Sequence, residues 1–404
     1  MPRGRKVFLC LWAVCLVLWG STPGRGADWV VLPGIELKSE YLSNINNSPT
    51  VKQSDYILSA RPNVSFSYNS EITKFEGKLA LLGLAYMQNS NLDQINQYYY
   101  INGDHKVTPR LSLSLLSSYI TDSTSNAELV TSGTSIGRQL RTAITLNPGM
   151  SYLFTERFST SVGYGFNMVD YQSQAYNNYK GQTITHGFDY LLNEKTTLLS
   201  RLTGSYYKYD ETSNTIVTLG PQIGFSHKYE EKWDISLLGG ANFSRTKADV
   251  GVLSADNPLG FLQVAQQSQM SKNVSPFFTV GTNYRWETGG LSLNYDRNQS
   301  PNAYGNQSQY NNFNLNINQS VSDKLNLSLN PYLYTSTIPN PGSEYNSKYI
   351  GIRPGITYKY TERTEIGAYY DFSYRSVTGS SNYSYPVNDV WVTLKYSYPL
   401  HYQY

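Results

Sequence analysis

Four histidines are the residues of this chain best suited to acid–base chemistry: His105, His186, His227 and His401. A serine-type hydrolase needs an imidazole within hydrogen-bonding reach of a hydroxyl group. Ser226 precedes His227, but neighbouring residues of an extended strand point to opposite faces. The histidines are scattered over separate segments, and no His/Asp set has the spacing of metal ligands. The pattern therefore predicts no catalytic residues, no metal site and no cofactor.

Charged side chains form the second chemically interesting set, because they alternate with apolar residues. Lys and Arg facing lipid near the midplane of a bilayer cost ~2–4 kcal/mol, so charged residues in such strands are expected to face water or a partner. Both signs occur in this set, interspersed with Asn, Ser and Thr. We expect it to line a water-filled lumen, and its members are Glu36, Lys38, Glu40, Arg61, Lys74, Glu76, Lys78, Arg141, Arg201, Asp234, Arg285, Asp296, Arg353, Lys359, Asp371, Arg375 and Lys395.

The elements that position these side chains are indicated by apolar and polar residues alternating with a period of two. Leu327 and Leu329, for example, alternate with Ser328 and Asn330. This pattern predicts strands with one apolar and one polar face. Eighteen strands are expected, with sixteen as the alternative if a hairpin is miscounted, at 32–41, 56–68, 73–87, 96–107, 110–121, 138–152, 157–171, 179–192, 195–209, 214–229, 232–246, 273–286, 290–298, 309–320, 324–335, 347–360, 363–375 and 388–404.

A four-residue motif recurs between these strands: an apolar or aromatic residue, a polar residue, an acid and a base. An acid–base pair between two alternating runs predicts a tight, solvated hairpin turn. Longer polar connections separate these turns, so short and long connections alternate along the chain. The copies of the motif lie at 154–157, 192–195, 229–232, 321–324 and 360–363.

Together these features predict an all-β fold, a closed antiparallel transmembrane β-barrel with short periplasmic turns and long extracellular loops. Charged residues are only 15% of the chain, whereas soluble proteins have about 25%, and there are 37 tyrosines. After the first residues, no stretch approaches the ~20 apolar residues of a membrane-spanning helix. Aromatic residues beside the short turns predict an interfacial girdle of Tyr68, Tyr152, Tyr190, Tyr229, Tyr284, Trp286, Tyr358 and Tyr360.

Residues 1–27 are expected to be a secretory signal peptide and residues 28–404 the barrel. The leader has a charged start, an apolar run at 7–19 and a small-residue exit. It contains four bases and no acid, so the remainder has a formal charge of −1 against +3 for the whole chain. A nucleic-acid partner is therefore not expected. Sec-type export to the outer membrane of a Gram-negative bacterium is the predicted route.

The chain resembles Gram-negative outer-membrane β-barrels of the porin type, especially those associated with exopolysaccharide and exosortase loci. The resemblance rests on PGIELKSEYLSNI at 33–45, ARPNV at 60–64 and the Tyr/Phe-Thr-Glu-Arg turns. The alternating segment that ends at Tyr404 also resembles the C-terminal strand by which assembly machinery recognises such barrels. The resemblance implies outer-membrane residence and a channel-like or export-associated role, and it supplies no catalytic residues.

We therefore expect a passive channel for hydrophilic solutes, with small saccharides as one candidate. The alternative is a non-conducting or accessory barrel in exopolysaccharide export or in a surface complex. Expected partners are outer-membrane lipid, lipopolysaccharide, the barrel assembly machinery and solutes or glycans, and a homotrimer is left open. Two connections stand out by length, 122–137 and 247–272, and either could fold inward as a constriction.

Overall fold

The computed structural model describes residues 28–123, 128, 138–254, 263–338, 345–379 and 382–403, with no side-chain description at 249–254, 263–268 and 401–403. The expected signal peptide at 1–27 lies outside these residues. Within them, no helix is long and apolar enough to cross a membrane.

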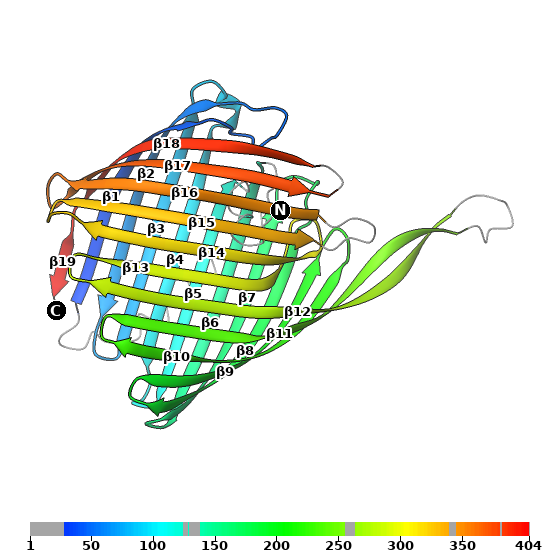
Figure 1. The fold of residues 1–404 in the computed structure, drawn as a ribbon, viewed down its shortest axis with the longest axis horizontal. Coiled ribbons are helices and arrows are strands. Elements are labelled where there is room, and N and C mark those ends of the chain that lie inside the picture. The colour runs from blue at the N-terminus through cyan, green and yellow to red at the C-terminus, as the bar shows by residue number, and fades with distance from the viewer. Residues whose placement is uncertain are drawn as a thin grey trace.

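The chain forms one continuous antiparallel sheet in which each strand from β1 to β17 pairs with the next along the sequence (Figure 1). A single-turn 3-10 helix, η1 (Ser90–Leu92), precedes the fourth strand. The strands are β1 (Asp28–Leu42), β2 (Asp55–Asn69), β3 (Thr73–Tyr86), β4 (Gln94–Lys106), β5 (Leu111–Ser123), β6 (Leu140–Thr155), β7 (Phe158–Tyr171), β8 (Tyr179–Asn193), β9 (Thr196–Tyr209), β10 (Thr215–Glu230), β11 (Trp233–Ser254), β12 (Gln263–Trp286), β13 (Gly289–Pro301), β14 (Gln307–Ser320), β15 (Leu325–Ile338), β16 (Tyr345–Lys359), β17 (Thr364–Thr378), β18 (Tyr383–Ser397) and β19 (Leu400–Gln403).

The sheet closes on itself because β1 pairs with β2 on one side and with β18 and β19 on the other. The two last strands are one strand interrupted at Pro399, where the N–H of Tyr398 still donates to the carbonyl of Pro33. Proline has no N–H for a ladder, which explains the break. The predicted closed barrel of eighteen strands is confirmed, with the final strand split in two. Because the strands alternate in direction, Asp28 and Gln403 lie at the end of the short turns.

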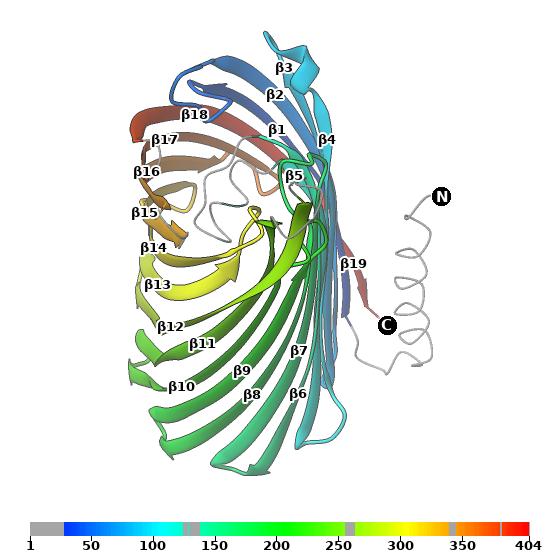
Figure 2. The same cartoon turned by 90° about the vertical axis from the view of Figure 1, so that its right-hand side faces the viewer.

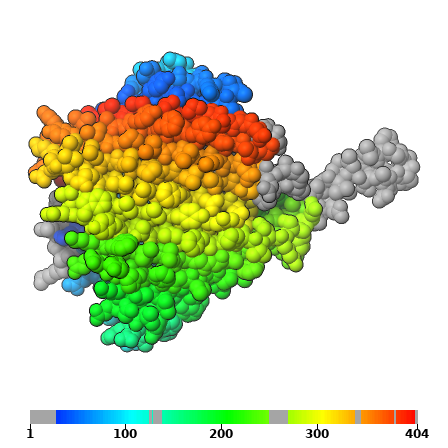
Figure 3. Space-filling view, in the orientation of Figure 1, coloured from blue at the N-terminus to red at the C-terminus, as the bar shows by residue number. Residues whose placement is uncertain are grey.

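Apolar side chains cover the outside of the wall. Ile35 and Leu37 on β1 are 40% and 44% exposed, whereas Glu36 between them faces inward. Directly opposed residues of antiparallel strands point to the same face, so the register extends this assignment around the ring. The space-filling view shows the outer wall from β10 to β18 as a continuous surface (Figure 3). The aromatic residues predicted for the girdle lie next to the short turns, and those within strands point outward, as in the contact between Tyr284 and Trp286.

The recurrent motif makes the short turns through its polar second residue. The side chain of Asn193 accepts hydrogen bonds from the N–H groups of Lys195 and Thr196 at 3.0 and 2.9 Å. Thr155 and Ser322 do the same in their own turns. Such a side chain replaces a backbone partner and fixes the turn, while the acid and base remain in solvent.

The strand boundaries differ most where a hairpin continues beyond the barrel. The expected strands 232–246 and 273–286 are longer in the structure, because β11 and β12 stay paired up to Ser254 and Gln263. This two-stranded extension projects from the loop end (Figure 1). β18 likewise begins earlier than expected, at Tyr383 rather than 388. Its first residues pair with β17, so neighbouring strands extend an element that its own sequence marks weakly.

Candidate pore and its constriction

The strand pairing places every charged residue singled out in the sequence on the inward-facing side of its strand. Lys395, Glu36 and Arg61 are directly opposed across β18, β1 and β2. On the next strand, β3, the residues Lys74, Glu76 and Lys78 oppose Asn69, Ser67 and Ser65 of β2. The other inner positions follow in the same way around the ring from Arg141 and Arg201 through Asp234, Arg285 and Asp296 to Arg353, Lys359, Asp371 and Arg375.

Part of this set meets in one cavity of about 420 Å³ on the inner side of the wall. The cavity lies between the last strands and the first strands of the ring. Ile45 of the β1–β2 loop also lines it and is 1% exposed, packed against Ile57 and Tyr86. The charged residues of the cavity are Glu36, Lys38, Glu40, Arg61, Arg138, Arg353, Asp371, Arg375 and Asp389.

Arg353 and Asp371 form an ion pair in this cavity, which we call the central cavity. The Nε and Nη2 atoms of Arg353 lie 2.9 and 2.5 Å from Oδ2 of Asp371. The hydroxyl of Tyr332 donates to the other carboxylate oxygen at 2.6 Å. Every carboxylate oxygen therefore has a donor, which a charge in a partly dehydrated site requires.

Aromatic rings face the same space and contact the bases. The Nζ atom of Lys38 lies 4.7 Å from the ring centre of Trp391, and the guanidinium of Arg375 lies 4.4 Å from that of Tyr349. Trp391 also stacks on Tyr369 at 5.2 Å. Rings in these positions stabilise the cations and offer flat apolar faces to a solute.

The remaining charged residues are distributed elsewhere. Arg141 is buried at the loop end, where its Nε lies 2.8 Å from Asp122 and its Nη1 lies 3.1 Å from Glu128. Arg201 pairs with Asp189 at 2.5 Å in the wall. The structure does not bring Lys74, Glu76, Lys78, Asp234, Arg285, Asp296, Lys359 or Lys395 into the central cavity.

A polar strip connects the cavity with the short-turn end. Along β15, Asn330 and Tyr332 line the cavity, whereas Asn326 and Ser328 line a second hollow of about 370 Å³ towards the turns. The amide of Asn330 donates to Asn316 of β14 at 2.9 Å. Hydrogen-bonding groups thus continue along one side of the lumen, where they can replace water around a polar solute.

The connection between β13 and β14 turns into the ring and rests on the opposite side, against β8–β10 (Figure 2). The hydroxyl of Tyr209 donates to the carbonyl of Asn306 at 2.6 Å and accepts from the N–H of Asn302 at 3.1 Å. Asn214 donates to the carbonyl of Gly305 at 2.9 Å. We call residues 302–306 the constriction loop, because they narrow the barrel near its loop end.

Apolar packing also fixes the constriction loop. Ala303 is completely buried in a small core with inward-facing Tyr209 and Ile216, which are also 0% exposed. Gly305 has a φ of +80°, and a Cβ there would lie 3.0 Å from the side chain of Asn177. The backbone conformation therefore favours glycine, and a larger residue would also crowd the side chain of Asn177.

Of the two connections expected to fold inward, 247–272 is the one whose outcome the structure shows. Most of 122–137 lies outside the described residues, although Glu128 is 1% exposed and accepts a hydrogen bond from Tyr171 at 2.5 Å. The segment 247–272 is not an inward loop, because its described backbone continues the β11–β12 ladder away from the barrel. Loop length did not single out the constriction loop, because that loop is short. The sequence feature that could have indicated this loop is its small and turn-forming residues, which follow Pro301.

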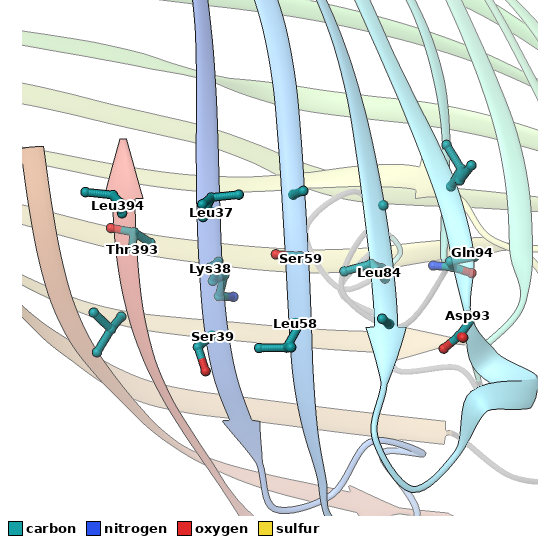
Figure 4. Close-up of a pocket in the computed structure, with 15 residues that line it drawn as sticks. Leu37, Lys38, Ser39, Leu58, Ser59, Leu84, Asp93, Gln94, Thr393 and Leu394 are labelled. Atoms are coloured by element: carbon teal, nitrogen blue, oxygen red, sulfur yellow. The ribbon is translucent and has the colours of Figure 1, made fainter. Parts of the chain in front are cut away.

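Another hollow, of about 850 Å³, lies on the outer side of β18 and β1–β4 (Figure 4). It arises where the outward residues Ala60 and Gly83 are small, between the larger Leu37, Leu394 and Ile95. The alternate residues Lys38, Ser59 and Thr393 belong to the inner parity. This hollow is an apolar depression of the outer face and has no part in the lumen.

Three of the four histidines are paired with threonines on the outward-facing side of their strands. Thr73 and His105, Thr160 and His186, and Thr196 and His227 are each 2.8–3.0 Å apart across neighbouring strands. The side chain of His401 lies outside the described set. No group of three or more potential metal ligands occurs among the residues that the structure describes. The absence of catalysis and of a cofactor stays a prediction from the sequence.

No family model matches the chain, and no curated protein matches its sequence. Solved structures do resemble it. OccK2 (OpdF) of Pseudomonas aeruginosa, crystallised in complex with glucuronate, is 12% identical, with 93% of this chain and 98% of that chain covered and a TM-score of 0.44. The outer membrane channel DcaP of Acinetobacter baumannii is 14% identical, with 92% of this chain and 98% of that chain covered and a TM-score of 0.42. The ferric-catecholate import receptor Fiu of E. coli is 9% identical, with 91% of this chain and 81% of that chain covered and a TM-score of 0.45.

Proposed function

We propose that this protein is an outer-membrane channel through which hydrophilic solutes diffuse passively. The observation that carries the proposal is the division of the wall into an apolar outer face and a polar inner face around a closed ring. A bilayer accepts the outer face and water fills the inner one. The charged residues from Glu36 to Lys395 are then pore-lining residues, with those of the central cavity next to the solute.

The path is proposed to run off-centre. The constriction loop and the buried core around Tyr209 fill the side of β7–β10 near the loop end. The opposite side retains the central cavity and the hollow beside Ser328. A solute would therefore pass along β15 and its neighbours, between amide side chains and aromatic rings. Such a lining suits uncharged or zwitterionic polar solutes, including small saccharides.

Planar bilayers provide the direct test. Purified barrel, shown to be folded by heat-modifiable gel mobility, should insert and give discrete conductance steps. A folded sample that never conducts overturns the proposal. Swelling of liposomes in neutral mono- and disaccharides, compared with amino acids and organic anions of similar size, tests the solute class.

The second candidate is a non-conducting accessory barrel in exopolysaccharide export. The inward constriction loop and the Arg353–Asp371 pair favour it, because both rigidify the interior. Co-purification of periplasmic or surface glycan-export proteins with a silent barrel distinguishes it from the channel. Both proposed functions are compatible with two further proposals: that the assembly machinery recognises the last strand, and that the barrel forms a homotrimer. Pulse-chase assembly in cells and light scattering in detergent measure them.

A further inference from the structure

Apart from Glu230, which opposes Trp233 beside the β10–β11 turn, the acidic and basic side chains at outward strand positions lie towards the loop end of the barrel. Among the outward strand positions whose side chains are described, the register identifies Asp170, Lys180, Lys208, Arg245, Lys247, Lys272, Arg297 and Lys348. All but one of these are bases. Protein surfaces commonly intersperse both signs, so an excess of one sign at these strand positions is a feature to be explained.

Five of the bases lie together on neighbouring strands from β8 to β12, and we call them the basic patch. Lys180 is directly opposed to Lys208, and Lys208 is followed in the same row by Thr215 and Lys247. The adjacent row brings Arg245 opposite Lys272. Neighbouring strands are about 4.8 Å apart, so the bases of each opposed pair are close neighbours, whereas β10 separates Lys208 from Lys247.

Direct opposition of like charges destabilises a sheet unless an anion lies between them. Lys180 pairs with Asp210 at 3.0 Å, but both side chains are about half exposed. Arg245 contacts the sulfur of Met270, which carries no charge. Within the described side chains, no ion pair is formed by Lys208, Lys247 or Lys272, and all three are exposed. The patch is therefore arranged for an external anion.

The height of the patch on the wall indicates which anion. Directly below its two rows, the outer face carries Ile184, Leu219, Phe243 and Val274, which are 57%, 50%, 50% and 63% exposed. The bases thus stand at the upper border of the apolar band, at the level of lipid headgroups. Phosphates there attract basic side chains, and each base near the surface strengthens binding.

The opposite end lacks such an arrangement. In the short turns, bases such as Lys195 and Arg157 lie next to the acids Glu194 and Glu156. A lipid with one phosphate needs one base, whereas several opposed cations match a headgroup with more than one phosphate. We propose that the basic patch binds an anionic glycolipid of the loop-side leaflet through two or more phosphates. This inference rests on the proposed membrane location, but it does not require that the barrel conducts.

The test is titration of the detergent-solubilised barrel with defined lipids, followed by native mass spectrometry. The probes are bisphosphorylated lipid A, monophosphorylated lipid A, phosphatidylglycerol and phosphatidylethanolamine. The patch variant replaces Lys180, Lys208, Arg245, Lys247 and Lys272 by Gln. Its matched control removes as many bases at the other end, by replacing Arg157, Lys195, Lys232, Lys324 and Arg363 by Gln. Heat-modifiable mobility shows that both variants are folded.

We expect bisphosphorylated lipid A to bind the native barrel at least tenfold more tightly than the monophosphorylated form. The patch variant should lose that preference, and the control should keep it. Equal binding of bisphosphorylated lipid A by the patch variant and the native barrel overturns the proposal. Phosphatidylglycerol that binds as tightly as bisphosphorylated lipid A overturns the assignment to a multiply phosphorylated headgroup. A barrel that binds bisphosphorylated lipid A selectively but never conducts would support this site and overturn the proposed channel function.

Discussion

Tyr209 holds the constriction loop at both of its ends, because its hydroxyl accepts the N–H of Asn302 and donates to the carbonyl of Asn306. These contacts join positions more than ninety residues apart in sequence. They fix a segment of five residues inside the barrel, where it determines the free cross-section.

Tyr209→Phe should loosen the constriction loop without emptying its core. The ring remains, and the N–H of Asn302 still donates to the carbonyl of Asn306 at 2.9 Å, but both groups lose their bond to the hydroxyl, at about 0.5–1.5 kcal/mol for each bond. We expect larger and noisier single-channel conductance in planar bilayers. Tyr206→Phe, on the outer face of the same strand, is the matched control and should conduct as the native barrel does. Unchanged conductance in Tyr209→Phe would show that the loop does not limit the pore.

Arg353→Gln should make the channel more selective for cations. The substitution leaves the carboxylate of Asp371 without its cation in the central cavity, so the local potential becomes negative. Asp371→Asn should shift the selectivity towards anions for the converse reason. Reversal potentials across a KCl gradient measure both shifts, with Arg110→Gln in a short turn as a control. Shifts of the same sign in the two variants would contradict the proposed path.

Leu202→Arg should prevent stable insertion, whereas Thr203→Arg should be tolerated. The two residues are neighbours near the middle of β9, but Leu202 is 47% exposed on the outer face and Thr203 faces inward. An arginine facing lipid at mid-depth costs about 2–4 kcal/mol. Denaturant unfolding in liposomes measures the difference. Equal losses of stability would mean that the two faces are not in different solvents.

Asn193→Ala should destabilise the β8–β9 hairpin by about 1 kcal/mol, because two turn N–H groups lose their acceptor. Asn193→Asp keeps an acceptor oxygen and should restore most of the loss. The free energy of unfolding in urea is the measurement. An Asp variant as weak as the Ala variant would argue that the cap has no role.

The strands and their faces could be predicted because a period of two is a local property of the sequence. Leu327 and Asn330, for instance, lie on the faces that their alternation indicates. The constriction loop could not be found in this way, because the burial of Ala303 depends on Tyr209, which is far away in sequence. Neither could the grouping of charges, since Arg353 meets Asp371 through strand register and Lys38 meets Trp391 through closure of the ring. The extension of β11 and β12 was missed because its sequence does not sustain the alternation: Val252 and Leu253 are adjacent, and residues 266–269 form an uninterrupted polar run.

Pairing of β1 with β18 and β19 makes a seam between the first and last parts of the described chain. Before the seam forms, the sheet has two unpaired edges that can join other chains. The seam cannot be completed until the residues around 400 have arrived, whatever has folded before them. Loss of β18 together with β19 would therefore leave an open, aggregation-prone ribbon, even though every other hairpin could still form.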